Sequence, residues 1–301
     1  MSKYELTDED RANLDGRPLV ASLSGGKDST AMSLQLMEWG LKFDAVFMDT
    51  GWEHPLSVKY VTEELPSVLG IEIKTLRPKL SMIDRILRYG HFPSRRTRWC
   101  TRELKVSPYE AHISATYKDT PPVSAVGIRA GESKARSTQP RWDVEAGDNM
   151  ALRMWRPLID WSVDDVIEIH QRHNVRPNPL YLKYGVERVG CWPCIFARKK
   201  EIATIAKADP ERIDLIHKLE QTAKSILELR GLDRNYAEAN WPPSMFALRT
   251  TRAGETDIRS ASIYEVIEWA QTARGGKQFE LDLPEEPGCV RWGMCDTGAD
   301  E

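Results

Sequence analysis

The amino-acid sequence predicts an α/β protein: a doubly wound, mostly parallel sheet with a helical C-terminal extension. Apolar, strand-like runs alternate along the chain with segments in which apolar residues recur at helical spacing. This alternation favours a parallel sheet that helices cover on both faces. The first run passes through a glycine pair into a helix, and the second ends in an acidic residue and a turn. At 301 residues the chain can bury a full core, and its length allows one large domain or two modest ones.

The first strand, turn and helix are expected between residues 19 and 37. An apolar run occupies residues 19–23, and Leu34, Met37 and Leu41 recur at helical spacing after the turn. Such a turn gathers backbone N–H groups and a helix N-terminus around one point, where their partial positive charge suits a phosphate or pyrophosphate. We therefore predict a nucleotide-binding loop formed by Ser24, Gly25, Gly26, Lys27, Asp28, Ser29 and Thr30.

Each residue type in this loop suits a particular role. The two glycines let the backbone approach the anion without a Cβ in the way, and the three hydroxyl side chains can donate further hydrogen bonds. Lys27 adds a point charge, and Asp28 could hold Mg²⁺ or orient the loop. The loop is not a Walker loop, because the spaced first glycine and the Gly-Lys-Ser/Thr order are both missing.

The second strand is expected at residues 43–48, and Asp49 follows it directly, before Thr50 and Gly51. Ligands of doubly wound sheets lie beyond the carboxyl ends of the strands. Asp49 is therefore placed to reach a ribose, an adenine or a metal. A carboxylate that caps a helix or closes a turn is the alternative.

The remaining elements follow from the same two periods. Strands are expected at 71–76, 121–128 and 154–158. Helices are expected at 54–69, at roughly 80–90, from the Ser162–Asp165 capping box, from Asp209-Pro210, and at 262–273. Residues 1–17 are polar and predict a short helix or a loose arm. We expect a nucleotide-binding α/β domain at residues 1–180 and a Cys-rich, helical region at 181–301 that folds onto the active-site face.

Arginines follow the expected strand at residues 121–128. Gly127 and Arg129 come at its end, and Arg136 lies further along the same segment. Arginine offers phosphate or sulfate oxygens a two-pronged donor that lysine cannot provide. We therefore predict that Gly127, Arg129 and Arg136 contact a nucleotide. Surface salt bridges are the alternative for the two arginines.

A second basic stretch surrounds Cys100 and contains Arg95, Arg96, Arg98, Arg102 and Lys105. It predicts a loop that receives an anionic substrate, with Trp99 available to stack on a base. A solvated basic loop is the alternative. Residues 198–200 would extend the same positive patch if the two segments meet. The net charge of −3 argues against a generally basic nucleic-acid binder, so any such patch is local.

The cysteines indicate metal or redox chemistry. Five is an odd count in a large chain, and the N-terminus has no apolar secretory core. The Cys-x-x-Cys spacing of Cys191 and Cys194 lets two thiolates bind one centre, and it is compatible with zinc, an iron–sulfur cluster or a redox dithiol. No apolar run approaches membrane-spanning length. We expect a cytoplasmic protein without a membrane partner.

Several of these motifs resemble one family. The loop from Ser24 to Ser29 is similar to the Ser-Gly-Gly-x-Asp-Ser loop of the PP-loop ATP pyrophosphatases and of their relatives, the phosphoadenylyl-sulfate (PAPS) reductases. The resemblance covers roughly residues 19–197 and includes Asp49-Thr50-Gly51, the segment from Gly127 to Arg136, and motifs at 157–166, 178–181 and 190–194. It implies an adenine nucleotide alpha-hydrolase-like fold.

The resemblance also implies ligands. Either ATP or an adenylyl sulfonucleotide would bind, with Lys27, Asp28 and Arg129 as catalytic residues. Cys100 lies in the loop that matches the cluster-bearing reductases, and the tail around Cys295 resembles the ending of some cluster-bearing members. The implied [4Fe–4S] ligands are therefore Cys100, Cys191, Cys194 and Cys295, with Cys289 spare. Zinc on the same four thiolates is the alternative.

Three functions stay open. In the first, the enzyme adenylylates a substrate with ATP and transfers sulfur to a nucleic acid, either DNA or tRNA, with a partner protein as sulfur or electron donor. In the second, it reduces adenylyl sulfate or phosphoadenylyl sulfate to sulfite. Two departures weaken the second: the central loop has one cysteine where cluster-bearing reductases have a pair, and the reductase tail motif Glu-Cys-Gly-Leu-His is missing. The third is a non-catalytic nucleotide sensor.

Overall fold

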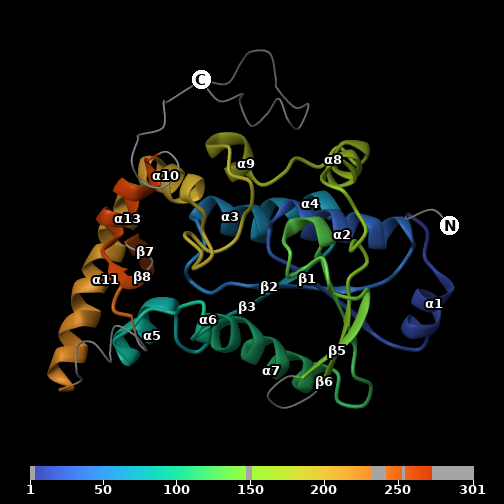
Figure 1. Ribbon diagram of the computed structural model, residues 1–301. Coiled ribbons are helices and arrows are strands. Elements are labelled where there is room, and N and C mark those ends of the chain that lie inside the picture. The colour runs from blue at the N-terminus through green and yellow to red at the C-terminus, as the bar shows by residue number, and fades with distance from the viewer. Residues whose placement is uncertain (1–3, 147–150, 232–241, 253–254, 273–301) are drawn as a thin grey trace.

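A computed structural model describes residues 4–146, 151–231, 242–252 and 255–272. Its centre is a six-stranded sheet in the order β3-β2-β1-β4-β6-β5 (Figure 1). All neighbouring strands are parallel except β5 and β6, which are antiparallel. The predicted doubly wound, mostly parallel sheet is therefore confirmed. The strands are β1 (Leu19–Leu23), β2 (Asp44–Met48), β3 (Ile73–Leu76), β4 (Val123–Val126), β5 (Trp142–Ala146) and β6 (Ala151–Trp155).

Strand β1 lies where the strand order reverses. The chain runs outward from β1 through β2 to β3, and then returns to β4 on the other side of β1. Val20 and Ala21 of β1 are fully buried because the sheet is covered on both faces. A reversal of strand order opens a crevice at the carboxyl ends of the two central strands, where doubly wound proteins bind ligands. The loops that follow β1 and β4 therefore flank the expected binding crevice.

Helices cover both faces of the sheet (Figure 1). In that view α2, α3, α4, α8 and α9 lie above the sheet, and α5, α6 and α7 lie below it. The elements above the sheet are α2 (Lys27–Glu38), α3 (Pro55–Lys59), α4 (Leu65–Leu69), α8 (Val163–Arg172) and α9 (Pro179–Tyr184). Those below are α5 (Met82–Tyr89), α6 (Trp99–Thr101) and α7 (Ser107–Thr116). A 3₁₀ turn, η3 (Ala130–Glu132), follows β4.

Two π-helical turns interrupt α-helices, one of them in a helix that was predicted as continuous. The helix predicted at 54–69 consists of α3, η1 (Tyr60–Glu64) and α4, and η2 (Arg102–Val106) joins α6 to α7. Each π-helical turn lies just before a proline, Pro66 or Pro108. Proline has no N–H to donate to the carbonyl four residues earlier, so the hydrogen-bond pattern changes there.

The strands at the β5 edge of the sheet differ from those expected from the sequence. The last strand was expected at 154–158 and is β6, which ends at Trp155, and β5 was not expected at all. Trp142 pairs with Trp155 and Asp143 with Met154 in this antiparallel hairpin. The sequence of β5, Trp-Asp-Val-Glu-Ala, alternates apolar and polar residues as strands do. The strand is short, polar and at the edge of the sheet, so this alternation predicts it only weakly.

Helix α1 (Asp8–Leu14) is anchored by a buried carboxylate, so the N-terminal segment is a docked helix. Asp10 is fully buried and accepts hydrogen bonds from the indole N–H groups of Trp142 and Trp155, each at 2.9 Å. Arg141 Nη2 donates to the same carboxylate at 2.8 Å. Burial opposes ionisation, but the hydrogen bond and charge of Arg141 outweigh it, so the pKa of Asp10 lies below its usual value.

The described C-terminal elements pack on one another beside the sheet. They are α10 (Lys199–Ala208), α11 (Pro210–Leu229), β7 (Phe246–Arg252), β8 (Glu255–Ala261) and α13 (Ile263–Ala270). Glu220 of α11, 5% exposed, accepts the backbone N–H groups of Met245 at 3.3 Å and Ile263 at 2.9 Å. Burial raises the pKa of Glu220 to about 7. This one carboxylate therefore ties the start of α13 and the segment before β7 to α11.

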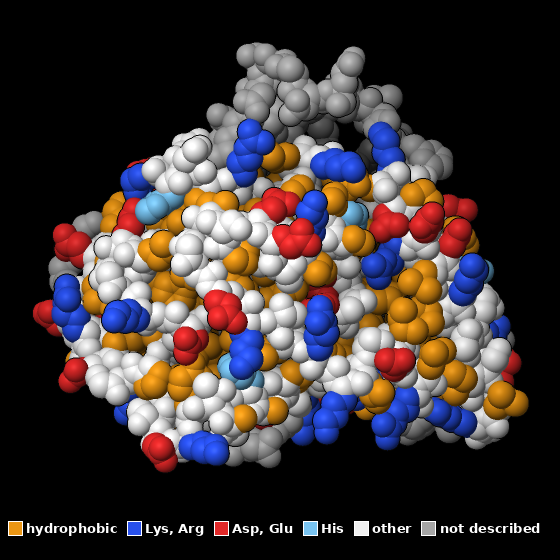
Figure 2. All heavy atoms as spheres, turned by 180° about the vertical axis from the view of Figure 1, so that it is seen from behind, with side chains coloured by type: hydrophobic (Ala, Val, Ile, Leu, Met, Phe, Trp, Pro, Cys, Tyr) orange, Lys and Arg blue, Asp and Glu red, His pale blue; other side chains and the backbone are white. Residues whose placement is uncertain are grey.

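The surface carries mixed charges. Figure 2 shows Lys and Arg side chains interspersed with Asp and Glu over the face opposite that of Figure 1, in keeping with a net charge of −3. In the described part of the chain, no helix has both the length and the apolar character needed to cross a membrane.

Candidate functional site

The loop between β1 and α2 has the backbone shape that an anion site needs. Gly25 adopts φ +72°, and a Cβ there would lie 2.4 Å from Cγ2 of Val61. Ser24 N donates to Ser29 Oγ at 3.1 Å, and Ser29 Oγ donates to the carbonyl of Gly26 at 2.9 Å. The hydroxyl of Ser29 therefore shapes the loop. Thr30 is fully buried, and a contact of its hydroxyl with a nucleotide stays a prediction.

Lys27 and Asp28 open α2, and the structure brings Arg129 to them. The Nε of Arg129, which is 6% exposed, donates to Oδ1 of Asp28, and Nζ of Lys27 lies 3.5 Å from Oδ2 of Asp28. The three predicted catalytic residues thus form one charged cluster between the loops after β1 and β4. One carboxylate oxygen of Asp28 accepts a hydrogen bond from Arg129, so Asp28 orients the arginine.

Gly127 lets the end of β4 approach the first turn of α2. A Cβ on Gly127 would lie 2.6 Å from the carbonyl oxygen of Asp28 and 2.8 Å from Cα of Ser29. No side chain fits in that space, because the atoms it would meet are backbone. Gly127 therefore belongs to the site by permitting this contact, which positions Arg129 two residues later.

The segment from Asn178 to Val189 holds the loop from the other side. Asn178 Nδ2 donates to the carbonyl of Gly25 and to Ser57 Oγ, both at 3.1 Å. The N–H of Lys27 donates to the hydroxyl of Tyr181 at 3.1 Å, and Lys27 Nζ donates to the carbonyl of Glu187 at 2.8 Å. Sequence reasoning placed Asn-Pro-Leu-Tyr in a motif but assigned it no contact. The motif indicated that these residues matter, but it did not indicate that they contact Gly25 and Lys27.

The other predicted nucleotide contacts are held by protein partners. Asp49, 9% exposed, accepts the N–H of Gly51 at 3.0 Å and the Nε–H of Arg77 at 2.9 Å. Asp49 follows β2, as predicted, and its ion pair with Arg77 lies at the rim of the crevice. Arg136 lies on the surface with 40% of its side chain exposed and pairs with Glu132. Contacts of Asp49 and Arg136 with a nucleotide stay predictions.

Three of the predicted thiol ligands come together. Cys100 lies in α6, and Cys191 and Cys194 lie in the loop before α10. Besides burial, the charge of Cys194 raises the pKa of Cys100, and the charges of Cys194 and Cys100 raise the pKa of Cys191, so these thiols lie near one another. Burial raises the pKa of Cys191 to about 11. The Cys191 thiol also lies 3.8 Å from Oε1 of Glu53.

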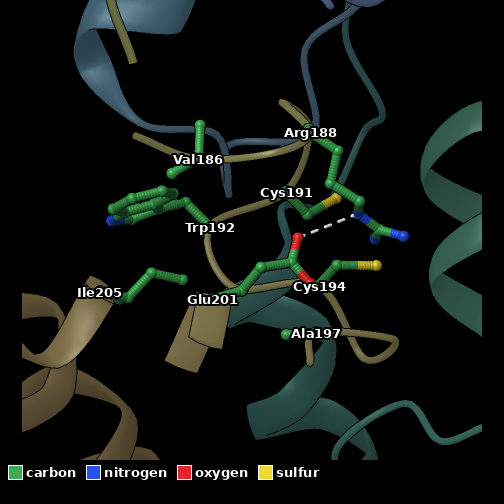
Figure 3. Close-up of a pocket in the computed structure, with 9 residues that line it drawn as sticks. Val186, Arg188, Cys191, Trp192, Cys194, Ala197, Glu201 and Ile205 are labelled. Carbon is green, nitrogen blue, oxygen red and sulfur yellow. Dashed lines mark ion pairs between the residues drawn. The ribbon is translucent and has the colours of Figure 1, made fainter. Parts of the chain in front are cut away.

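Lys105 is a cation that interacts with these thiols. The negative charge of a Cys191 thiolate raises the pKa of Lys105 against the opposing effect of burial. Figure 3 shows the sulfur atoms of Cys191 and Cys194 beside the pocket that Val186, Trp192 and Ile205 help to line. Arg188 and Glu201 form an ion pair of 3.2 Å at the same pocket. Burial, together with the negative charge of Glu53, outweighs the charge of Lys105, so the pKa of Cys191 is raised and its neutral thiol is favoured.

The predicted metal site is incomplete in this structure. Thiolates have the right donor chemistry for iron or zinc. Within the described ranges, however, no group of three or more His, Cys, Asp or Glu side chains is placed to hold a metal ion. Cys289 and Cys295 lie outside the described residues. The cluster ligands therefore stay a prediction.

One expectation about the basic loop is wrong. Trp99 was expected to be available for stacking on a base, but it is only 7% exposed and packs edge-on against Tyr89 at 5.6 Å between ring centroids. Trp99 lies next to Cys100 in the chain, at the place where a second cysteine would stand in a Cys-Cys pair. An indole that large is more stable when buried in the apolar cluster than when exposed.

Parts of this chain are similar in sequence to known proteins. A family model described as "Phosphoadenosine phosphosulfate reductase domain" matches residues 18–197. An uncharacterized protein of Escherichia phage 186 is 29% identical over 87% of this chain and 90% of its own length. An adenosine 5'-phosphosulfate reductase of Streptomyces coelicolor is 31% identical, and the match covers 50% of this chain and 61% of that protein. An uncharacterized protein of Methanocaldococcus jannaschii is 31% identical over 73% of this chain and 44% of its own length.

Two solved structures are also similar. A PAPS reductase from Candida auris has a TM-score of 0.49 at 17% identity, with 64% of this chain and 89% of that chain covered. A tRNA thiolase from Methanococcus maripaludis, solved with its [4Fe–4S] cluster, has a TM-score of 0.41 at 16% identity, with 73% and 76% covered.

Proposed function

This chain belongs to the phosphoadenosine phosphosulfate reductase family, and on that premise we propose that it is an ATP-dependent enzyme that transfers sulfur to a nucleic acid. An oxygen of the acceptor attacks the α-phosphorus of ATP, and pyrophosphate leaves. A sulfur nucleophile from a donor then replaces the activated oxygen, and AMP leaves. The protein's part is to hold the nucleotide, orient the acceptor and admit the sulfur donor.

One observation carries the proposal: the nucleotide loop and the cysteine segment are joined directly. Lys27 Nζ donates to the carbonyl of Glu187 at 2.8 Å, four residues before Cys191. A nucleotide held by the loop after β1 would therefore react on the same face that presents the thiols. Lys27 and the α2 amides would stabilise the pyrophosphate as it departs. Asp28 would keep Arg129 oriented toward the phosphates.

Sulfonucleotide reduction is the second candidate. The adenosine 5'-phosphosulfate reductase of Streptomyces coelicolor shares 31% identity with this chain. In this reaction a thiolate attacks the sulfur of the sulfonucleotide and the adenylate leaves. A second thiol then releases sulfite and leaves a disulfide, which an external dithiol reduces. Cys191 and Cys194 could supply that pair. The single cysteine at position 100, where cluster-bearing reductases have a pair, speaks against it.

The deciding experiment compares products. Purified protein is incubated with ATP, sulfide and either DNA or pooled tRNA, and separately with each sulfonucleotide and thioredoxin. We expect acceptor-dependent release of pyrophosphate and incorporation of sulfur into one nucleic acid, with no sulfite. Lys42→Ala, an exposed change just after α2, serves as the unaffected control. Sulfite from a sulfonucleotide would establish the reductase instead. Tight nucleotide binding without either product would favour the third function, a non-catalytic nucleotide sensor.

Metal content tests the proposed cofactor separately. We expect anaerobically purified protein to be brown and to contain about four irons per chain. Cys191→Ser and Cys295→Ser should each lower the iron content, whereas Cys289→Ser should leave it unchanged. Colourless protein with about one zinc per chain would show that the four thiolates hold zinc. Loss of metal in Cys289→Ser, with retention in Cys295→Ser, would show that Cys289 is the fourth ligand in place of Cys295.

A further inference from the structure

Two segments that are far apart in the chain meet beside the thiols. The guanidinium carbon of Arg95 lies 5.6 Å from the ring centroid of Phe196, and that of Arg98 lies 5.1 Å from the same centroid. Phe196 follows Cys194 by two residues, and Arg98 precedes Cys100 by two. The arginines therefore stand at the edge of the thiol group.

The loop that presents these arginines is held by its own hydrogen bonds. Ser94 Oγ accepts the N–H groups of Arg96 at 3.2 Å and Thr97 at 3.0 Å, and Ser94 N donates to the carbonyl of Thr97 at 3.1 Å. The closed turn fixes the backbone between Ser94 and Thr97. Stacking on Phe196 restricts two of the side chains further, so less rotamer freedom is lost when a ligand binds.

Among the described residues, no carboxylate pairs with the arginines of this loop. Arg95, Arg96 and Arg98 are exposed, and no Asp or Glu of the described ranges lies within ion-pair distance of them. Arg98 donates to Thr101 Oγ1 at 3.2 Å. Nearby arginines differ: Arg85 pairs with Glu103 and Arg188 with Glu201. Guanidiniums that have no carboxylate partner among the described residues can bind an external anion.

We infer that Arg95, Arg96 and Arg98, ordered on Phe196, form a binding site for the phosphodiester backbone of the nucleic-acid acceptor; this inference rests on the proposed function. Three planar forks match successive phosphate groups, which a chain of linked phosphates supplies. The adenine nucleotide has its own anion site at the loop after β1. Trp99 is buried, so this site contacts phosphates without a stacked base. The acceptor would be drawn to the thiols by its backbone, largely without regard to sequence.

The test is binding without turnover. Fluorescence anisotropy measures the affinity of labelled single-stranded DNA and RNA of about 20 nucleotides for the full chain, without ATP, over a range of salt concentrations. The variant is Arg95→Gln with Arg96→Gln and Arg98→Gln. The matched control also removes three exposed charges, as Arg11→Gln with Arg17→Gln and Lys42→Gln. Each lost phosphate contact should lower the slope of log K against log salt by about 0.7, so the variant should lose a slope of about 2 and bind at least about tenfold more weakly at low salt.

The outcomes separate this site from the proposed function. Wild-type affinity and slope in the variant would overturn the site even if ATP-dependent sulfur transfer occurs. A weakened variant with no sulfur transfer would retain the site and overturn the proposed function. Polyglutamate that competes with the oligonucleotide at equal charge concentration would show that the arginines bind an acidic protein surface, which also overturns the inference. Equal loss in the matched control would show a general charge effect.

Discussion

Replacing Lys27 by alanine is expected to lower nucleotide-dependent turnover by a factor of about 10² to 10³ while the fold is retained. This is the usual scale for loss of one oriented group that stabilises charge in a transition state. The Lys27 side chain is 12% exposed, lies 5.2 Å from the Tyr181 ring centroid and donates to the carbonyl of Glu187. The protein therefore holds the ammonium group in place before the nucleotide binds.

Two further variants separate charge from packing at this position. Lys27→Met keeps the length of the side chain without the charge and should lose turnover as Lys27→Ala does. Lys42→Ala removes a lysine of the same strand–helix unit and should retain turnover. Turnover is followed by pyrophosphate release, and folding by thermal unfolding. Wild-type rates in Lys27→Met would show that the ammonium group takes no part in the reaction.

The structure predicts that Asp28→Ala has two effects. From the sequence alone, Asp28 was expected to hold Mg²⁺ or to orient the loop. In the structure, Asp28 is the partner of Arg129, which is 6% exposed. Removal of one member of a buried ion pair leaves the other charge without compensation and costs about 3–5 kcal/mol. Asp28→Ala therefore affects stability as well as turnover, and Lys27 is the better test of the site.

Asn178→Ala is expected to lower stability by about 3 kcal/mol and to weaken nucleotide binding at least about tenfold. Asn178 is 1% exposed. Its Nδ2 donates to the carbonyl of Gly25 and to Ser57 Oγ, and its Oδ1 accepts the N–H of Leu180 at 3.1 Å. The alanine leaves these buried groups without partners and frees the glycine loop on its Asn178 side.

Asn13→Ala provides the matched control, because Asn13 is also hydrogen-bonded but lies on α1. Its Nδ2 donates to the carbonyl of Glu9 at 3.0 Å, and its Oδ1 accepts from Arg153 at 2.9 Å. We expect this control to lose no more than about 1 kcal/mol and to bind nucleotide normally. Chemical denaturation and calorimetric titration with ATP measure the two effects. Unchanged ATP affinity in Asn178→Ala would mean that the loop keeps its shape without this contact.

These two variants probe one connected unit. Lys27 contacts both the hydroxyl of Tyr181 and the carbonyl of Glu187, and Asn178 holds the carbonyl of Gly25. The segment from Asn178 to Cys194 therefore runs from the nucleotide loop to the thiols with hydrogen bonds at its start. If the unit is coupled as the contacts indicate, the effects of Lys27→Ala and Asn178→Ala on nucleotide binding should not add.

The local features of this protein could be predicted from its sequence. The strands β1, β2 and β4 are apolar runs, because both faces of a parallel sheet are buried. The capping box at Ser162 and the N-cap at Asp209 are confirmed, since such caps depend on residues within one helical turn. The glycine loop was identified for the same reason: its positive φ at Gly25 and its place between a strand and a helix are properties of adjacent residues.

The contacts that make the site depend on residues far apart in the chain, and only the tertiary structure decided them. Arg129 lies 101 residues from Asp28, and Tyr181 lies 154 residues from Lys27. No local pattern specifies which residues meet across such distances, because the partners are set by strand order and helix packing. The same holds for Trp99, which the sequence left free to stack on a ligand and which packing buried. The sequence determined the sheet and the loop; the way the sheet winds determined which side chains surround them.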